Sequence, residues 1–170
     1  AVTGVQPCSL PLAFTLSEAE DQVPVLLRVA NDWVREELPP RTVYGNQYTI
    51  HRYRPRVEGL FARIEHWVNT SIATDTFWRS ISKDNITTWY GRTAQSRVAD
   101  PVDPSRIFSW LVCESYDDKG NAVFYEYKPE DSASGDLSHV QERNRSDLPR
   151  SAQRYVKRIR YVHRAPYARA

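Results

Sequence analysis

Short runs of alternating side chains, separated by turn-forming residues, are the sequence feature that most constrains the fold of this 170-residue chain. In residues 60–68, Leu, Ala, Ile, His and Val occupy every second position, which is the spacing of a β-strand. Two further short runs, 76–82 and 86–91, lie on either side of the turn-favouring trio 83–85. Helical periodicity is weak. We therefore predict a mostly β chain of antiparallel sheets, sandwich-like, with short hairpins and at most one short helix.

Other strand-like runs occur toward both ends of the chain. Residues 23–29 are rich in Val and Leu. Pro39-Pro40 would end any helix that began at Trp33. Gly45-Asn46 separates two arms of aromatic and β-branched residues, which predicts a hairpin. Residues 154–162 alternate again and predict a final strand.

One segment favours a helix. Residues 139–153 follow Ser138, which is a suitable N-cap, and Glu142 lies close behind it. Pro149 limits the length of this predicted helix.

The acidic stretch 117–121 is either a metal-binding loop or the corner of a hairpin. A calcium loop of the EF-hand type needs acidic ligands at alternating positions and a bidentate Glu at its end. Here the acidic residues are followed by Ala, Val and Phe. Gly120 can adopt the left-handed backbone conformation that closes a short loop, and Asp117 can accept hydrogen bonds from the local backbone. We predict a hairpin corner, with structural roles for Asp117, Gly120 and Asn121 and no metal site.

The two arms beside this corner carry apolar side chains on both faces. In the arm 107–116, for example, Phe108 and Trp110 lie on one face and Leu111 and Cys113 on the other. This pattern is typical of a strand covered on both sides, so we expect either a sandwich or a face that docks on material outside the chain. The residues assigned to the core are Trp67, Trp78, Trp89, Trp110 and Tyr125.

Composition and spacing give little support to catalysis, metal binding or membrane insertion. The four histidines are too scattered to argue for zinc, and no cofactor is expected. No apolar run approaches the roughly 20 residues of a membrane helix. Four carboxylates could in principle supply a catalytic pair, but we interpret them as residues of exposed strand faces and as cross-strand partners of Arg54, Arg56 and Arg63. They are Glu58, Glu65, Glu114 and Glu126.

Two basic runs interleaved with tyrosine resemble strands that bind single-stranded nucleic acid. They contain Arg52, Arg54 and Arg56 around Tyr53, and Lys157, Arg158 and Arg160 between Tyr155 and Tyr161. The net charge is only +2, from 23 basic and 21 acidic residues, so no strong overall field favours nucleic acid. We expect these charges to pair with the acids or to meet another protein surface.

Long ordered strings resemble a known family. The strings are RYRPRVEGLFARIEHW, starting at Arg52, and WRSISKDNITTWYGRTAQSRVADPVDPSRIFSWLVCESYDDKGNAVFYEYK, starting at Trp78. They are similar to the N-terminal domain of the plasmid virulence protein B (SpvB) family. The same domain opens the B component of bacterial insecticidal toxin complexes (Tc toxins). YDDKGN also resembles the unit of tyrosine-aspartate (YD, Rhs-type) repeats.

The resemblance implies a mostly β domain with a structural role, since the B and C components of Tc toxins form a hollow β shell around a toxic segment. We therefore expect a secreted scaffold, not an enzyme, whose partners are other domains of the same protein and the C-type toxin component. The family's ADP-ribosyltransferase needs an Arg, a Ser-Thr-Ser strand and a Glu-x-Glu turn. Residues 69–71, Asn-Thr-Ser, match the Ser-Thr-Ser strand only in part.

The start of the chain does not fit the family. AVTGVQPCSLPL resembles the in-frame translation of a sequencing adapter, departing at Pro7, Ser9 and Leu12, and the chain contains no Met. We expect residues 1–20 to be non-native or disordered, 21–164 to be a β domain cut from a longer chain, and 165–170 to be a tail. A natural N-terminal loop is the alternative.

A different class of function is a carbohydrate-binding β-sandwich that uses surface tryptophans. Trp67, Trp78 or Trp89 would then be the stacking platform. Exposed, coplanar rings would favour this function, whereas buried rings would favour the scaffold.

Overall fold

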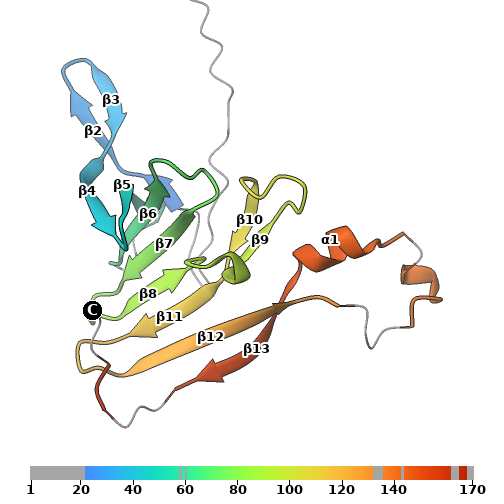
Figure 1. Cartoon of the computed structure of the whole chain (residues 1–170). Helices are drawn as coiled ribbons and strands as arrows, with labels where there is room; N and C mark the ends of the chain where they lie inside the picture. Colours follow the sequence, from blue (N-terminus) through green and yellow to red (C-terminus); the bar gives the residue numbers. More distant parts are fainter. Residues whose placement is uncertain are drawn as a thin grey trace, which may run out of the picture.

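The computed structural model describes residues 22–57, 59, 61–131, 136–142, 144–161 and 165–167. This part of the chain is mostly β, with antiparallel sheets and one short α-helix, which confirms the predicted fold class (Figure 1). The predicted N-terminal segment 1–20 lies outside the described residues. Among the helices that the structure describes, none has the length and apolar character needed to cross a membrane.

One nine-stranded sheet dominates the described part of the chain. Its order is β1-β5-β6-β7-β8-β11-β12-β13, and β4 pairs with the same edge of β5 as β1 does. Most neighbours in the sheet are also consecutive in the sequence, so the sheet is built largely from hairpins. The strands are β1 (Gln22–Pro24), β4 (Glu37–Val43), β5 (Asn46–Pro55), β6 (Arg63–Asn69), β7 (Thr76–Ile81), β8 (Thr87–Tyr90), β11 (Val112–Tyr116), β12 (Ala122–Pro129) and β13 (Arg154–Arg160).

Two small sheets accompany the large one. They pair β2 (Leu26–Val29) with β3 (Asp32–Arg35), and β9 (Arg97–Ala99) with β10 (Ile107–Trp110). Figure 1 shows the β2–β3 hairpin standing away from the large sheet. The predicted run 23–29 is thus divided between β1 and β2. The predicted arm 107–116 is divided at Leu111, because the backbone of Leu111 bonds to Ser96 and Gly91 instead.

Local turn chemistry explains two of the hairpins. The predicted β4–β5 hairpin is present, but its two-residue loop is Tyr44-Gly45, one residue earlier than Gly45-Asn46. Both loop residues have positive φ, 49° and 80°, as a type I′ turn requires. The predicted turn at 83–85 joins β7 to β8, with Asn85 at φ 59°.

Apolar clusters cover both faces of the sheet centre. Face A carries Tyr48, Ile50, Trp67, Phe77 and Trp89, and face B carries Ile64 and Trp78. Leu38 and Val43 of β4 pack against the face A cluster. Trp110 of β10 packs on face B, where Gly91 leaves room for its ring. Side chains of β4 therefore cover part of the face A cluster, and Trp110 of the β9–β10 pair covers part of the face B cluster.

The predicted helix 139–153 is wrong in extent. The structure has a short 3-10 helix, η2 (Val140–Glu142), and a six-residue helix, α1 (Asp147–Ala152), whose N-cap is Ser146. Ser138 does not cap a helix, because its N–H and its hydroxyl both donate to Asp136. Pro149 lies in the first turn of α1, where a missing N–H leaves no helical bond unmade.

Candidate interaction surface

Seven residues lie in register across seven strands on face A. We term them the cross-strand row: Arg52, Glu65, Arg79, Trp89, Glu114, Phe124 and Arg160. Side chains of directly paired residues project to the same face about 5 Å apart, so neighbours in such a row interact. The row therefore runs across the sheet from β5 to the edge strand β13.

The centre of the row is a buried carboxylate. Glu65 has no exposed surface, and its carboxylate lies 2.6 Å from Nη2 of Arg79 and 2.6 Å from Nε of Arg63. Trp67 Nε1 also donates to it at 3.0 Å. Burial lowers the pKa of Arg79, and the neighbouring Glu65 charge opposes that shift. The expectation that this carboxylate lies on an exposed strand face and pairs across strands with Arg63 is wrong. Glu65 is buried, Arg63 belongs to the same strand, and the cross-strand partner is Arg79 of β7.

Arginines and aromatic rings alternate along face A. The guanidinium of Arg79 lies 5.0 Å from the ring centroid of Trp67 and 5.3 Å from that of Trp89. Arg92 lies 5.2 Å from Trp89 and 5.4 Å from Tyr44, and its Nη1 is 3.0 Å from Glu114. We term this series the cation–π ladder. Since Tyr44 is 78% exposed, the ladder leads from the core to the surface.

Two hollows meet at Tyr44 and form what we term the face A groove. One, of about 440 Å³, is lined by Arg41, Arg79 and the ladder tryptophans. The other, of about 690 Å³, is lined by residues of the β8–η1 loop and of β11, β12 and β13. Its charged lining residues are Arg92, Glu114, Glu126, Lys157 and Arg160.

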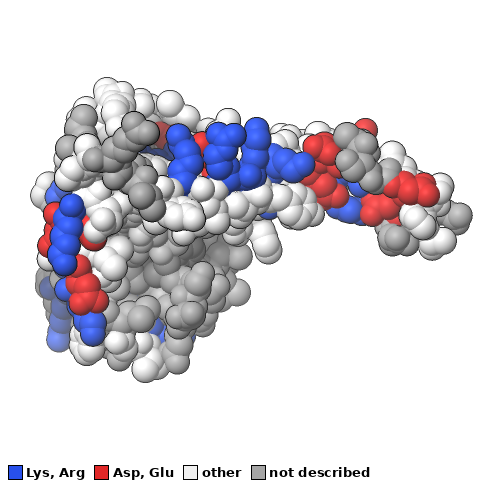
Figure 2. Space-filling view, turned by 90° about the horizontal axis from the view of Figure 1, so that it is seen from below, with Lys and Arg blue, Asp and Glu red and all other residues white. Residues whose placement is uncertain are grey.

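The edge strand β13 is exposed along nearly its whole length. Figure 2 shows a row of basic side chains along the arm formed by β12 and β13. Arg158 and Arg160 pair with Glu126 of β12, at 3.7 and 3.0 Å. Lys157 forms no ion pair with any described residue. Between the basic residues, Tyr155, Val156 and Ile159 are about half exposed.

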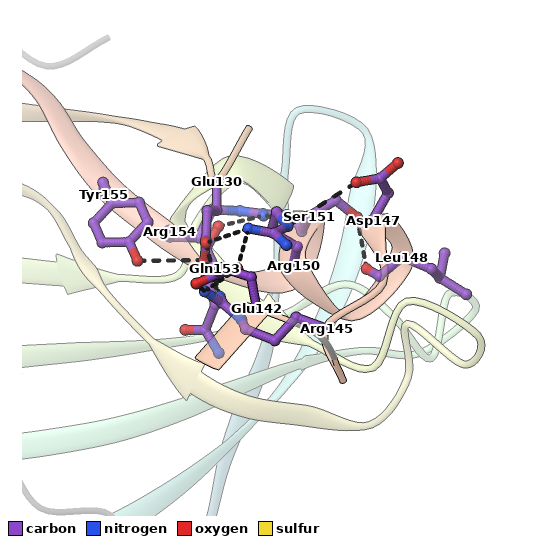
Figure 3. Close-up of polar contacts among 10 residues, drawn as sticks. All are labelled: Glu130, Glu142, Arg145, Asp147, Leu148, Arg150, Ser151, Gln153, Arg154 and Tyr155. Carbon is purple, nitrogen blue, oxygen red and sulfur yellow. Dashed lines mark hydrogen bonds and ion pairs between the residues drawn. The ribbon is translucent and has the colours of Figure 1, made fainter. Parts of the chain in front are cut away.

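An ionic cluster fixes η2 and α1 to the far end of this arm (Figure 3). Arg150 is only 6% exposed; its Nη1 lies 2.7 Å from Glu142 and 3.6 Å from Glu130. Arg145 contacts the same two carboxylates, at 2.7 Å from Glu130 and 3.2 Å from Glu142. Hydrogen bonds from Arg150 and Arg145 lower the pKa of Glu142.

A second polar network, which the sequence analysis did not predict, connects β5, the β6–β7 turn and β9. Arg97 is 7% exposed and donates to Asp75 at 3.1 Å and to the carbonyls of Gly91 and Thr74. Tyr48 donates to Asp75 at 2.5 Å. Burial, and then Asp75, raise the pKa of Tyr48 to about 12.

The acidic corner 117–121 joins β11 to β12. Asp117 accepts hydrogen bonds from the backbone of Lys119 and Asn121 at 2.9 Å, and the side chain of Asn121 donates back to it at 2.7 Å. Gly120 has φ +85°. The corner also contacts a residue of the predicted tail, because the backbone N–H of Tyr167 donates to the carbonyl of Gly120 at 2.9 Å. The hydroxyl of Tyr167 donates to Glu114 of the cross-strand row at 2.8 Å.

The predicted core residues differ in burial. Trp67, Trp78 and Trp89 are 2%, 5% and 2% exposed, while Trp110 is half-buried and Tyr125 is half-buried outside both clusters. Three buried rings offer no stacking platform, so the carbohydrate-binding alternative loses the surface tryptophans on which it depended. The largely exposed tryptophan is Trp33, on the β2–β3 hairpin.

The residues proposed for other chemistry are dispersed or used locally. In the described ranges, no three His, Cys, Asp or Glu side chains gather as a metal site. Glu114 and Glu126 pair with arginines of other segments, and Glu58 is outside the described residues. Residues 69–71 form a turn, in which Asn69 accepts from the backbone of Ser71. The Glu-x-Glu that the transferase pattern requires occurs once in the sequence, at 18–20, which is outside the described residues.

Comparisons with known proteins agree with this architecture. The family model described as "Salmonella virulence plasmid 65kDa B protein" (SpvB) matches residues 12–170. The mono(ADP-ribosyl)transferase SpvB of Salmonella typhimurium (strain 14028s / SGSC 2262) is 35% identical over 125 residues, which is 74% of this chain and 20% of that protein. The chain thus spans about one fifth of the length of the curated relatives it matches.

Two solved structures show where similar folds occur. The N-terminal domain of the effector protein SpvB from Salmonella typhimurium strain LT2 superposes with a TM-score of 0.74 and 32% identity, over 90% of this chain and 47% of that one. A chain in the crystal structure of TcdB2-TccC3 superposes with a TM-score of 0.64 and 25% identity. That match covers 85% of this chain and 6% of the other.

Proposed function

The chain belongs to the SpvB family, and from this we propose that it is a structural part of a toxin-complex B-type or plasmid virulence protein. In this role it helps to enclose and deliver a separate toxic domain. The larger protein is a secreted bacterial toxin or effector, and its other domains and a C-type toxin component are the partners.

The single observation that carries the proposal is the fold similarity to a region of the TcdB2-TccC3 structure. The matched region is 6% of that large chain, as expected if the domain is one segment of a wall. The transferases of the family are matched over one fifth of their length, and the matching solved structure is an N-terminal domain. In the proposed mechanism, the chain contributes packing and exclusion, and no bond chemistry.

Exposed apolar side chains support the presence of such partners, because apolar patches on a protein surface commonly mark contacts with other proteins. The β2–β3 hairpin exposes Trp33 by 62% and Val29 by 57%, and β13 exposes Val156 by 53%. The remaining domains of the same protein are the proposed occupants of both surfaces.

A chimera tests the proposal. Residues 22–161 replace the matching segment of TcdB2, the chimera is produced with TccC3, and protease digestion of the TccC3 C-terminal region is followed over time. We expect a complex in which that region is protected as it is with TcdB2. A matched control carries the corresponding segment of the Salmonella SpvB N-terminal domain. Two results would contradict the proposal. One is a complex of the chimera with TccC3 in which the TccC3 C-terminal region is digested rapidly. The other is binding of TccC3 by the control chimera but not by the chimera that carries residues 22–161.

A further inference from the structure

Cations from four separate parts of the chain line the face A groove. They are Arg41 of β4, Arg79 of β7, Arg92 of the segment after β8, and Lys157 and Arg160 of β13. Two carboxylates, Glu114 and Glu126, line the same groove. The lining is therefore positively charged, although the net charge of the whole chain is small.

Ion pairs within the chain engage only some of the donor groups of these cations. Arg79 contacts Glu65 through Nε and Nη2, and Arg92 contacts Glu114 through Nη1, while a guanidinium has five N–H donors. Arg41 and Lys157 form no ion pair with any described residue. They line different hollows, Arg41 the smaller one and Lys157 the larger one. Both are therefore available to an anionic ligand.

The guanidinium groups are also held in place before any ligand arrives. Arg79 and Arg92 are stacked in the cation–π ladder, and Arg160 lies 5.8 Å from the ring centroid of Phe124. A side chain that is already ordered loses little conformational entropy on binding, and a fixed guanidinium matches the geometry of a carboxylate.

The shape and the aromatic lining select the kind of ligand. Single-stranded nucleic acid needs several exposed rings on which successive bases stack. Of the groove's aromatic residues, Tyr44 is largely exposed, whereas Trp67 and Trp89 are buried and the rings of β12 are half-buried. Two hollows that share Tyr44 and are lined by several cations suit a chain whose charges are spaced along it. We propose that the face A groove binds an extended, acidic peptide segment of a partner protein.

Binding of a defined peptide to the full 170-residue chain tests this site. The probe is a fluorescein-labelled octapeptide that alternates Glu and Ala, and its Gln–Ala analogue is the matched ligand control. We expect fluorescence anisotropy to show at least tenfold tighter binding of the Glu peptide at low salt, with the difference shrinking as salt is added. Equal affinity for the two peptides would overturn the proposal.

Variants locate the site on the molecule. The double variant R41Q/K157Q removes two exposed cations that form no ion pair with the described part of the chain, and is expected to weaken binding of the Glu peptide about tenfold. Tyr44→Asn keeps a residue that tolerates positive φ but removes the ring, and is expected to weaken binding about threefold.

The control R28Q/K83Q removes two exposed charges outside the groove and should leave the affinity unchanged. Equal losses in the two double variants, or tighter binding of oligothymidylate than of the Glu peptide, would overturn the assignment. Neither result bears on the shell role, which the chimera tests separately.

Discussion

Glu65 of β6 and Arg79 of β7 form an ion pair at the centre of the sheet, with 2.6 Å between the carboxylate and Nη2 and no exposed surface on Glu65. Removing one member of a buried pair leaves an uncompensated charge, which costs more than a surface pair gains. This pair also places Arg79 between Trp67 and Trp89, so it holds the cation–π ladder in position.

Arg79→Met is therefore expected to lower the free energy of unfolding by about 3–5 kcal/mol, because Glu65 stays buried with fewer partners. Urea unfolding followed by tryptophan fluorescence measures the change. The double variant E65Q/R79M should lose less than the sum of the single variants, since the two effects are coupled. Arg63→Met removes a partner of Glu65 whose side chain is 43% exposed and is the control, with a loss of about 1 kcal/mol or less. Equal losses for R79M and R63M would contradict the buried pair.

Protonation of His66 is expected to make the fold sensitive to mild acid. Burial, with smaller contributions from His51 and Arg35, lowers the pKa of His66 to about 3 from its ordinary 6.5. Between these two values the unfolded chain binds a proton that the folded chain does not, so stability falls as the pH falls through that window.

The wild-type chain should lose about 2 kcal/mol more stability than H66Q when the pH drops from 7 to 5. Urea titrations at the two pH values measure this difference, and an NMR titration of the imidazole checks its cause. A ring that titrates near pH 6.5 in the folded chain would refute the explanation.

Gly120 is expected to be intolerant of any side chain for two reasons. Its φ is +85°, and a Cβ there would lie 2.6 Å from Cβ of Pro166 and 2.9 Å from the backbone of Tyr167. Gly120→Val should therefore cost about 1–3 kcal/mol in the free energy of unfolding. Gly45→Ala is the matched control for Gly120→Ala, since Gly45 has φ +80° but nothing within 4 Å of an added Cβ, and it should cost about 1 kcal/mol. Removal of residues 165–170 should shrink the difference between Gly120→Ala and Gly45→Ala; an unchanged difference would exclude the Pro166 contact as its cause.

Arg150 is expected to hold α1 on the β12–β13 arm. Arg150→Met leaves Glu142 and Glu130 with Arg145 as their remaining ion-pair partner among the residues of Figure 3, and should destabilise the local structure by about 3 kcal/mol. Hydrogen exchange of the α1 amides should quicken accordingly. Arg145→Met, at a residue whose side chain is 40% exposed, is the control and should change exchange by less than about fivefold. If both variants speed exchange equally, Arg150 has no special role.

Local patterns in the sequence predicted those strands and turns that depend on residues close together in the chain. The alternating run 60–68 corresponds to strand β6 only from Arg63 onward, since Phe61 has a positive φ. The turn trio 83–85 and the corner at Gly120 correspond to turns, because turn chemistry acts over a few residues. The β4–β5 loop was misplaced by one residue, since Tyr44 shares the positive φ with Gly45.

Non-local relationships escaped prediction. The pairing of Glu65 with Arg79 and the order of rings in the cation–π ladder depend on strand register, which no single segment encodes. The break at Leu111 depends on bonds to Ser96 and Gly91, and the short α1 depends on the ionic cluster beyond it. Tyr125 was assigned to the core by its residue type, although its position in β12 leaves it half-buried.

Hydrogen–deuterium exchange of two segments tests most directly whether this chain is one part of a larger wall. The segments are β2–β3 (26–35) and β13 (154–160), measured in the isolated chain and in the TcdB2 chimera bound to TccC3. Because their exposed apolar side chains are proposed to contact other domains, we predict that exchange slows at least tenfold in the chimera, while the central strands β6 and β7 change little. Exchange in these two segments that is equally fast in both states would contradict the account.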